Sequence, residues 1–444
     1  VDSLLLIGAR IGANLLALVW TVLLVRLLDA DGAGLALQAV SVAQIASILV
    51  TLNVESGAMR AIVPARAEGR MDRAAAFIRF NRRIMLASVP ALGLAVLLAW
   101  AAGVAPGWPP ALLGAMLPAV VLVALARLSA RHATALGVMR KGLLPRLLTG
   151  PVVLTAVLGL AWLEGWPLAP SHVVMLFALS EGLTVLIQNW LLRGDFAFLR
   201  DAPPPPAAAP PEPRRWIALG LWLSPGLVMA EYRKAILIAT AGLVLSDAET
   251  GMFAVAFSII NILNFGVNAV DIAFSPRIAA AMAGQAPRLR DRLLASSAAI
   301  KLAGLGLGSL LVLALGPTAL GWFGSGFQAA WPALMALLLV PAGSVLFGPG
   351  SVLLSSGGQG RADFAANLVA AAACVAAICV LGARLGMTGA ALGAGLAHLA
   401  GQAAGAWLCA RRLGIDPTLL VLRRLRGGHA TPPPPRAPAR GLAR

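Results

Sequence analysis

The chain has 444 residues, of which 59% are hydrophobic and 12% are charged, and apolar stretches recur along its whole length. This composition excludes an ordinary soluble domain and is typical of helical membrane proteins. The formal net charge of +17 does not indicate nucleic-acid binding, because the Arg residues lie in short connections between the apolar stretches.

Apolar segments long enough to cross a bilayer follow one another from the start of the chain. A transmembrane helix needs about 20 such residues. The expected spans are Leu4–Leu28, Gly34–Leu52, Ile84–Val104, Ala111–Leu128, Leu143–Leu163, Pro170–Leu192, Trp216–Leu245, Met252–Pro276, Leu293–Leu315, Trp331–Leu353, Phe364–Leu385 and Thr388–Leu413. The sequence therefore predicts an all-α integral membrane protein with twelve transmembrane helices. Arg10 interrupts the apolar core that a cleavable signal peptide would need, so we expect no such segment.

The spans divide into an N-terminal six-helix bundle, residues 1–200, and a C-terminal six-helix bundle, residues 216–413. Residues 201–215 are rich in Pro and Ala and predict a stiff, extended cytoplasmic linker. Residues 414–444 are basic and Pro-rich and predict a disordered cytoplasmic tail, with contact to anionic lipid head groups as the alternative.

A faint repeat relates the two halves at an offset of 217 residues. The matching sets are Leu28, Gly34, Ser41, Gln44, Ser47, Thr51 and Arg60 in the first half, and Leu245, Gly251, Ser258, Asn261, Asn264, Asn268 and Arg277 in the second. Both copies begin on the same side of the membrane. The halves are therefore expected to be related by an axis along the membrane normal.

Connections rich in Arg alternate with connections that have no Lys or Arg. Residues 60–83 carry seven Arg, whereas residues 29–32, 105–110 and 247–251 carry no basic residue. Cytoplasmic loops of membrane proteins carry the excess of Lys and Arg. Both termini are accordingly predicted to be cytoplasmic.

The eighth span carries a stripe of polar side chains. Its polar residues are Ser258, Asn261, Asn264, Asn268, Asp271 and Ser275. Spacings of three and four residues place them on one helical face. A carboxylate that faced lipid would be costly, so the stripe should face protein or a water-filled path.

Other spans add polar residues to the same predicted cavity. Glu231, Arg233 and Lys234 lie in the seventh span, Arg10 and Asn14 in the first, and Gln44 in the second. Neighbouring helical residues point about 100° apart, so Arg233 and Lys234 need not face the same space. Glu231 and Lys234 are three apart and could form an ion pair. The sequence shows no zinc-ligand spacing and no Ser, His and Asp set for catalysis.

Four stretches carry a family resemblance: VRLLDADGAGLALQAVSVAQ at Val25–Gln44, ESGAMRAIVPARAEGR at Glu55–Arg70, the segment Phe323–Ala373, and GMTGAALGAGLAHLAGQ at Gly386–Gln402. In these stretches, and in its twelve spans, the chain resembles the O-antigen and exopolysaccharide flippases of the multidrug, oligosaccharidyl-lipid and polysaccharide (MOP) exporter superfamily. The resemblance extends to about Leu413. It implies a MATE-like fold, with two pseudo-symmetric six-helix bundles that open a central cavity to either side in turn.

The resemblance also implies a function without enzymatic chemistry. Such a flippase moves undecaprenyl-diphosphate-linked oligosaccharide from the cytoplasmic to the periplasmic leaflet of the bacterial inner membrane, for cell-surface polysaccharide biosynthesis. Its partners would be that lipid-linked sugar, membrane lipids, a polysaccharide polymerase and glycosyltransferases. No cofactor is expected, although transport could be coupled to a H+ or Na+ gradient.

The candidate residues have more than one role open to them. Arg10, Arg233 and Lys234 carry donors that match phosphate oxygens, although Arg10 could instead extend to the membrane surface. The amides Asn14, Gln44, Asn261, Asn264 and Asn268 could bind sugar hydroxyls or form interhelical hydrogen bonds of about 0.6 kcal/mol each.

Glu231 and Asp271 are the coupling and gating candidates. Asp271 could exchange a proton, lock the cytoplasmic side of the cavity by pairing with Arg10, or form a plain structural ion pair. For Glu231, a structural pair with Lys234 and a contact to ligand are both open.

Three alternative functions remain. A lipid II flippase would be expected to have more than the twelve spans counted. A multidrug exporter of cations would be expected to carry a carboxylate in the first span, where this chain has Arg10 and Asn14. A polytopic glycosyltransferase or polymerase would need a large extracytoplasmic loop or an acidic site, and the loops on that side are short.

Overall fold

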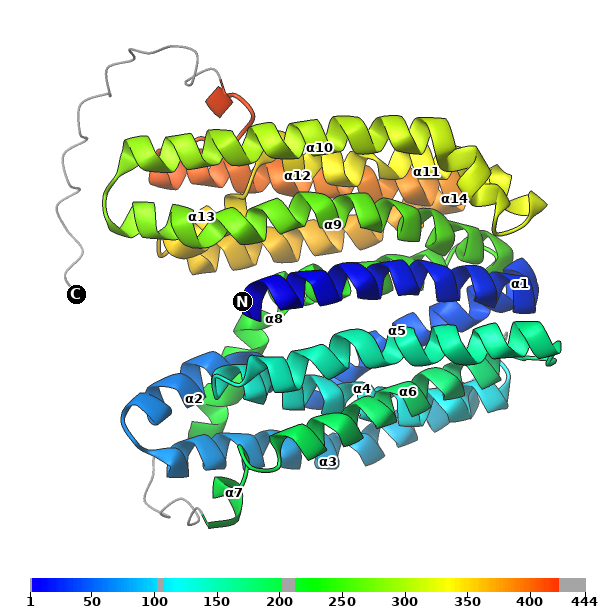
Figure 1. Cartoon of the computed structure of the whole chain (residues 1–444), viewed down its shortest axis with the longest axis horizontal. Helices are drawn as coiled ribbons and strands as arrows, with labels where there is room; N and C mark the ends of the chain where they lie inside the picture. Colours follow the sequence, from blue (N-terminus) through cyan, green and yellow to red (C-terminus); the bar gives the residue numbers. More distant parts are fainter. Residues whose placement is uncertain (1, 102–107, 202–211, 423–444) are drawn as a thin grey trace.

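The computed structural model describes residues 2–101, 108–201 and 212–422, and within these ranges the chain is helical and has no β-strand (Figure 1). Most of the predicted linker, at residues 202–211, and of the predicted tail, from residue 423, lies outside the described residues. Helix α8 already begins at Glu212, inside the range expected for the linker.

Residues 1–201 contain α1 (Asp2–Thr51), η1 (Val54–Gly57), α2 (Ala58–Ala67), α3 (Met71–Ala101), α4 (Pro110–Ala135), α5 (Met139–Glu164), α6 (Pro170–Leu192) and α7 (Phe198–Asp201). The rest contains α8 (Glu212–Ala241), α9 (Asp247–Ala283), α10 (Pro287–Gly321), η2 (Ser325–Ala330), α11 (Trp331–Leu337), α12 (Leu339–Phe347), α13 (Gly350–Ser356) and α14 (Gly360–Leu413). Helices satisfy every backbone hydrogen bond within the segment, which a bilayer requires.

Two helices contain a sharp reversal. At 1.5 Å per residue, a straight α1 or α14 would be more than twice the length of the roughly 30 Å hydrocarbon core. Non-helical residues divide both helices: Asp29, with φ 61° and ψ −170°, and Gly386, with φ 60° and ψ −149°. The Asp29 carboxylate accepts a hydrogen bond from the Gly32 backbone N–H at 3.0 Å and so caps the second leg of α1.

Nine helical segments within the described residues are long and apolar enough to span a membrane. Two of these segments are the doubled α1 and α14, and α8 supplies the remaining crossing. The all-helical, twelve-span architecture predicted from the sequence is therefore confirmed, and the chain is a multi-pass membrane protein.

Helix α8 connects the two halves of the molecule (Figure 1). Near its start, Trp216 packs edge-on against Phe77 of α3, with ring centroids 5.3 Å apart. Near its end, Leu237 and Ile238 belong to the apolar core that joins α1, α9, α11 and α14. The helix changes direction between these contacts at Tyr232, which has non-helical φ and ψ of −115° and 16°.

The second leg of α1 and the start of α9 meet at a reciprocal backbone contact. A Cβ atom added to Gly34 would lie 1.8 Å from the Asp247 carbonyl oxygen, and one added to Gly251 would lie 2.6 Å from the Ala30 carbonyl oxygen. Gly34 and Gly251, like Ala30 and Asp247, are related by the offset of 217 residues. Equivalent residues therefore contact each other across a local two-fold axis.

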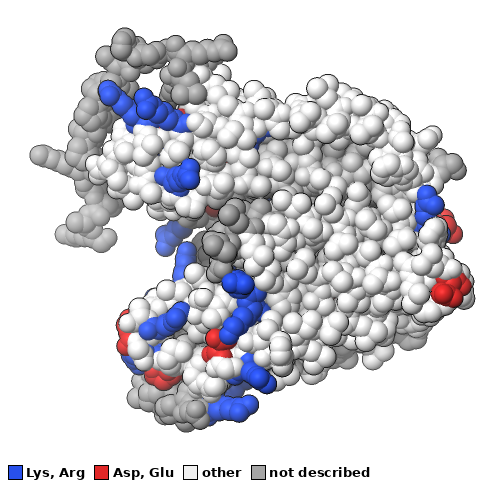
Figure 2. All heavy atoms as spheres, viewed as in Figure 1, with Lys and Arg blue, Asp and Glu red and all other residues white. Residues whose placement is uncertain are grey.

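The charges lie mostly at the two ends of the molecule (Figure 2). Lys and Arg gather at the end that contains α2 and α13, which we call the basic end, and this end has a hollow between the two halves. The visible surface between the ends is almost free of charge, as the wall of a membrane protein must be. At the opposite end the Gly34 and Gly251 contact holds the halves together.

Candidate functional site

Four consecutive side chains next to the break in α8 form the centre of a polar cluster. They are Glu231, Tyr232, Arg233 and Lys234. Because successive helical residues point about 100° apart, the four side chains reach different neighbours. Glu231 and Tyr232 contact helices of the N-terminal half, whereas Arg233 and Lys234 face helices of the C-terminal half.

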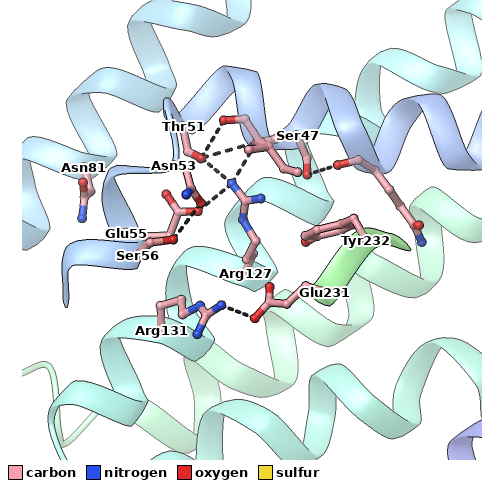
Figure 3. Close-up of polar contacts among 12 residues, drawn as sticks. Ser47, Thr51, Asn53, Glu55, Ser56, Asn81, Arg127, Arg131, Glu231 and Tyr232 are labelled. Carbon is pink, nitrogen blue, oxygen red and sulfur yellow. Dashed lines mark hydrogen bonds and ion pairs between the residues drawn. The ribbon is translucent and has the colours of Figure 1, made fainter. Parts of the chain in front are cut away.

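On the N-terminal side, Glu231 forms an ion pair with Arg131 of α4, and both side chains are 27% exposed (Figure 3). Arg146 of α5 donates a hydrogen bond to the Tyr232 hydroxyl at 3.0 Å. The Arg127 guanidinium lies 5.8 Å from the centroid of the Tyr232 ring, within the range of a cation–π contact. Three cations from α4 and α5 therefore surround the break in α8.

Arg127 is also the centre of a buried network. It pairs with Glu55 at 2.6 Å, donates to the Ser47 carbonyl at 3.2 Å, and donates to the Thr51 hydroxyl (Figure 3). The Arg127 and Glu55 side chains are 2% and 1% exposed, and a charge buried to this extent needs a partner. The network therefore fixes the end of α1 against α4.

On the C-terminal side, Lys234 donates a hydrogen bond to the Ser258 hydroxyl of α9 at 2.9 Å. Lys234 forms no ion pair with any described residue. Ser258 begins the polar stripe, so the stripe contacts α8 through this residue.

The Asp271 carboxylate is paired with the Lys301 ammonium of α10 at 2.9 Å. Lys301 has no exposed side-chain surface and also donates to the Ser344 carbonyl of α12 at 3.3 Å. The partner of Asp271 is thus a cation of its own half, and not Arg10, which lies exposed on the first leg of α1. Of the roles open to Asp271, the structural ion pair is present in this conformation.

The remaining predicted residues are spread along the two halves. Asn14 and Gln44 are half-buried on the first and second legs of α1, and Asn261 and Asn268 are half-buried on α9. Asn264 is buried, and its side-chain oxygen has no hydrogen-bond partner among the described residues. The ion pair considered between Glu231 and Lys234 is absent, because Glu231 pairs with Arg131.

Four cations of the cluster were not among the predicted site residues: Arg127, Arg131, Arg146 and Lys301. Arg127 and Lys301 each lie within an apolar span, and the criterion that selected Arg10 would have selected them as well. Arg131 follows the fourth expected span, and Arg146 lies near the start of the fifth. Their approach to α8 depends on the packing of α4 and α5, which spacing along the sequence does not specify.

No family model matches the chain, and no curated protein matches it. Several solved structures are similar to the chain in fold. An inward-facing multidrug resistance MATE family transporter of the MOP superfamily superimposes with a TM-score of 0.70 at 13% identity, over 92% of this chain and 98% of that chain. The lipid II flippase MurJ, in an inward closed conformation, gives 0.65 at 12% identity, over 95% of this chain and 90% of that chain.

An outward-facing MATE family transporter gives a lower TM-score of 0.53 at 13% identity, over 92% of this chain and 96% of that chain. These proteins are described as transporters and as a flippase. At such identities the similarity establishes the fold. The chain therefore has a fold similar to that of these MATE family transporters and of the flippase MurJ.

Proposed function

We propose that the protein moves an undecaprenyl-diphosphate-linked saccharide from the cytoplasmic to the periplasmic leaflet by alternating access. Cations next to the break in α8 carry this proposal: Arg131 and Arg146 contact α8 from the N-terminal half, and Lys234 lies on α8 itself, at the boundary of the two halves. A diphosphate loses hydration when it leaves water, and charge-assisted hydrogen bonds from cationic side chains offset that cost. Lys234, which has no carboxylate partner among the described residues, is the first ligand for a phosphate oxygen.

The charge pairing favours an anionic cargo over a cationic one. The carboxylates of Glu55, Glu231 and Asp271 are each paired with a basic side chain. A cation entering the cluster would have to displace one of these partners. The similar flippase MurJ is described as acting on lipid II, which supports a lipid-linked substrate for this fold.

The proposed location is the inner membrane of a bacterium. Under the positive-inside rule the basic end is cytoplasmic, as are both termini. The hollow at the basic end would then receive the lipid-linked sugar on the side where glycosyltransferases assemble it, and a polysaccharide polymerase would take it over on the other side.

The polar stripe supplies the remaining proposed contacts. Asn261, Asn264 and Asn268 of α9, with Asn14 and Gln44 of α1, would bind sugar hydroxyls. Arg10 would meet the incoming head group on the first leg of α1, and the pair of Glu231 with Arg131 would gate the basic end. Asp271 would couple transport to a H+ or Na+ gradient if the ion replaced Lys301 as its partner.

Transport can be measured in liposomes that contain the purified protein and a fluorescent undecaprenyl-diphosphate oligosaccharide. The expected result is protein-dependent exposure of the probe on the opposite leaflet. Export of a cationic dye from the same vesicles, without movement of the lipid probe, would contradict the proposal and indicate a multidrug transporter.

The substitution Lys234→Gln should lower the rate of flipping by about tenfold or more, since a hydrogen bond to a charged group contributes about 1.5–3 kcal/mol. Arg288→Gln, which removes an exposed cation at the start of α10, is the matched control and should leave the rate unchanged. Equal rates for both variants at equal abundance would remove Lys234 from the site.

A further inference from the structure

The C-terminal half contains a cavity to which none of the contacts proposed for the lipid head group extends. It lies between α8, α12, α13 and α14 and leaves about 60 Å³ to the centres of water-sized molecules. Its polar lining consists of Arg233, Ser351, Asp363, Asn367, His398 and Gln402. Its walls are otherwise built mainly from small residues of α14, such as Ala370 and Gly401, which leave room beside the polar groups.

Arg233 is the group whose charge is not compensated. Its Nε atom is buried and has no hydrogen-bond partner, and its guanidinium forms no ion pair with any described residue. Arg127, Arg131 and Lys301 differ, because each has a carboxylate partner, and Arg146 and Lys234 donate hydrogen bonds to Tyr232 and Ser258. A half-buried guanidinium without an anion is expensive unless water or an anionic ligand solvates it.

The two ends of the cavity have different chemistry. Arg233 lies close to Cys374 and His398, which line one end. Asn367 and Asp363 line the other end, about 10 Å and about 16 Å from Cys374 along the first leg of α14 at 1.5 Å per residue. The cavity thus offers a cationic donor at one end and acceptor-rich groups at the other.

The acceptor-rich end is already oriented by hydrogen bonds. The Asn367 amide donates to the Asp363 carboxylate at 3.0 Å and to the Ser351 hydroxyl at 3.4 Å. His398 shares a hydrogen bond of 3.1 Å between its Nε2 atom and the Ser344 hydroxyl. These contacts hold the lining side chains in place, while the Asp363 oxygens can accept hydrogen bonds from a ligand and the Gln402 amide can both accept and donate.

Resting on the proposed function, we propose that this cavity binds one saccharide unit that carries a carboxylate, with the carboxylate on Arg233 and hydroxyls toward Asp363, Asn367 and Gln402. A guanidinium binds a carboxylate through two parallel hydrogen bonds, which a neutral sugar cannot form. Hydroxyls of a sugar ring both donate and accept, which suits a mixed lining of carboxylate and amides. The site would make the transporter selective for acidic saccharides.

The transport experiment compares two undecaprenyl-diphosphate disaccharide probes in proteoliposomes, one ending in glucuronic acid and one in glucose. The wild-type protein should move the glucuronate probe about tenfold faster, as one charge-assisted interaction allows. Arg233→Gln should remove this preference, and Arg233→Lys, which keeps the charge without the planar fork, should retain part of it. Lys234→Gln should slow both probes and leave their ratio unchanged.

Equal wild-type rates for the two probes, or a preference that survives Arg233→Gln, would overturn the site assignment. The wild-type comparison keeps the test decisive even if the Arg233 variants fail to fold. Movement of neither probe would instead contradict the proposed function of the whole protein.

A binding measurement tests the cavity without transport. In a Cys379→Ser, Cys409→Ser background, Cys374 in the cavity lining is the remaining thiol. Free glucuronate should slow alkylation of Cys374 at concentrations at which glucose does not. Equal alkylation rates in both sugars would overturn the proposal even if flipping occurs.

Discussion

At the scale of single residues, each strongly buried charge of the polar cluster is paired by a residue from a different element. Arg127 of α4 holds Glu55 of η1, and Lys301 of α10 holds Asp271 of α9. Arg233 has no such partner among the described residues. We therefore treat the paired charges as structural and Arg233 as a candidate ligand contact.

The Arg127 and Glu55 pair gives a prediction about stability. Arg127→Met or Glu55→Leu alone should destabilise the protein by about 3–5 kcal/mol, because each change leaves the other charge buried without a partner. The double variant Arg127→Met, Glu55→Leu should unfold at a higher temperature than either single variant. Thermal unfolding in detergent, followed by tryptophan fluorescence, measures this difference. A double variant that loses the sum of the two single effects would show that the charges do not interact.

At the scale of elements, α8 belongs to both halves. Its beginning packs on α3 through Trp216, its end packs in the core of the C-terminal half, and its polar residues lie at the break between these parts. A movement of one half relative to the other must therefore bend α8 or change its contacts near Tyr232. The same helix would carry both the substrate contact at Lys234 and the mechanical connection between the halves.

The ion pair of Glu231 with Arg131 allows this connection to be tested by charge reversal. Arg131→Glu or Glu231→Arg should slow flipping severalfold, because each places like charges side by side at the basic end. The double reversal should recover most of the wild-type rate. Since both groups are partly exposed, thermal stability should change little, by about 1 kcal/mol or less. Failure of the double variant to recover, at normal abundance, would contradict a role for the pair in transport.

At the scale of the whole molecule, the hollow lies at the basic end and the contact between Gly34 and Gly251 closes the opposite end. The higher TM-score with the inward-facing MATE structure than with the outward-facing one agrees with this arrangement. The contact at the closed end requires glycine at two positions related by the internal repeat, since the backbones approach too closely for any Cβ atom. Closure of this end therefore depends on the absence of side chains at these two positions.

Gly34→Val and Gly251→Val should prevent this closure and shift the population toward an outward-open state. Spin labels at Asp31→Cys and Glu249→Cys, in a protein without its native cysteines, should show a longer distance in either variant. Gly266→Val on α9 is the matched control, because a Cβ atom there would meet no atom within 4 Å. An unchanged distance in Gly34→Val would show that the two backbones can separate without opening the end.

The sequence by itself determined the features that depend on local composition. Hydropathy and charge predict the spans, the alternation of basic loops and the division into two related halves. Both properties can be calculated for each segment without knowing which other segments it contacts. It also identified Glu231, Arg233, Lys234 and Asp271, since an ionisable group within an apolar span is costly wherever the span lies.

Only the tertiary structure decided which groups meet. How separate helices pack determines three results. Glu231 pairs with Arg131 and not with Lys234, and Asp271 pairs with Lys301 and not with Arg10. Arg233 has no ion-pair partner among the described residues. The repeat matched Gly34 with Gly251 by position, whereas their mutual contact required the two-fold arrangement of the halves. Helix periodicity specifies the direction of a side chain on its own helix, and packing between helices specifies what that side chain reaches.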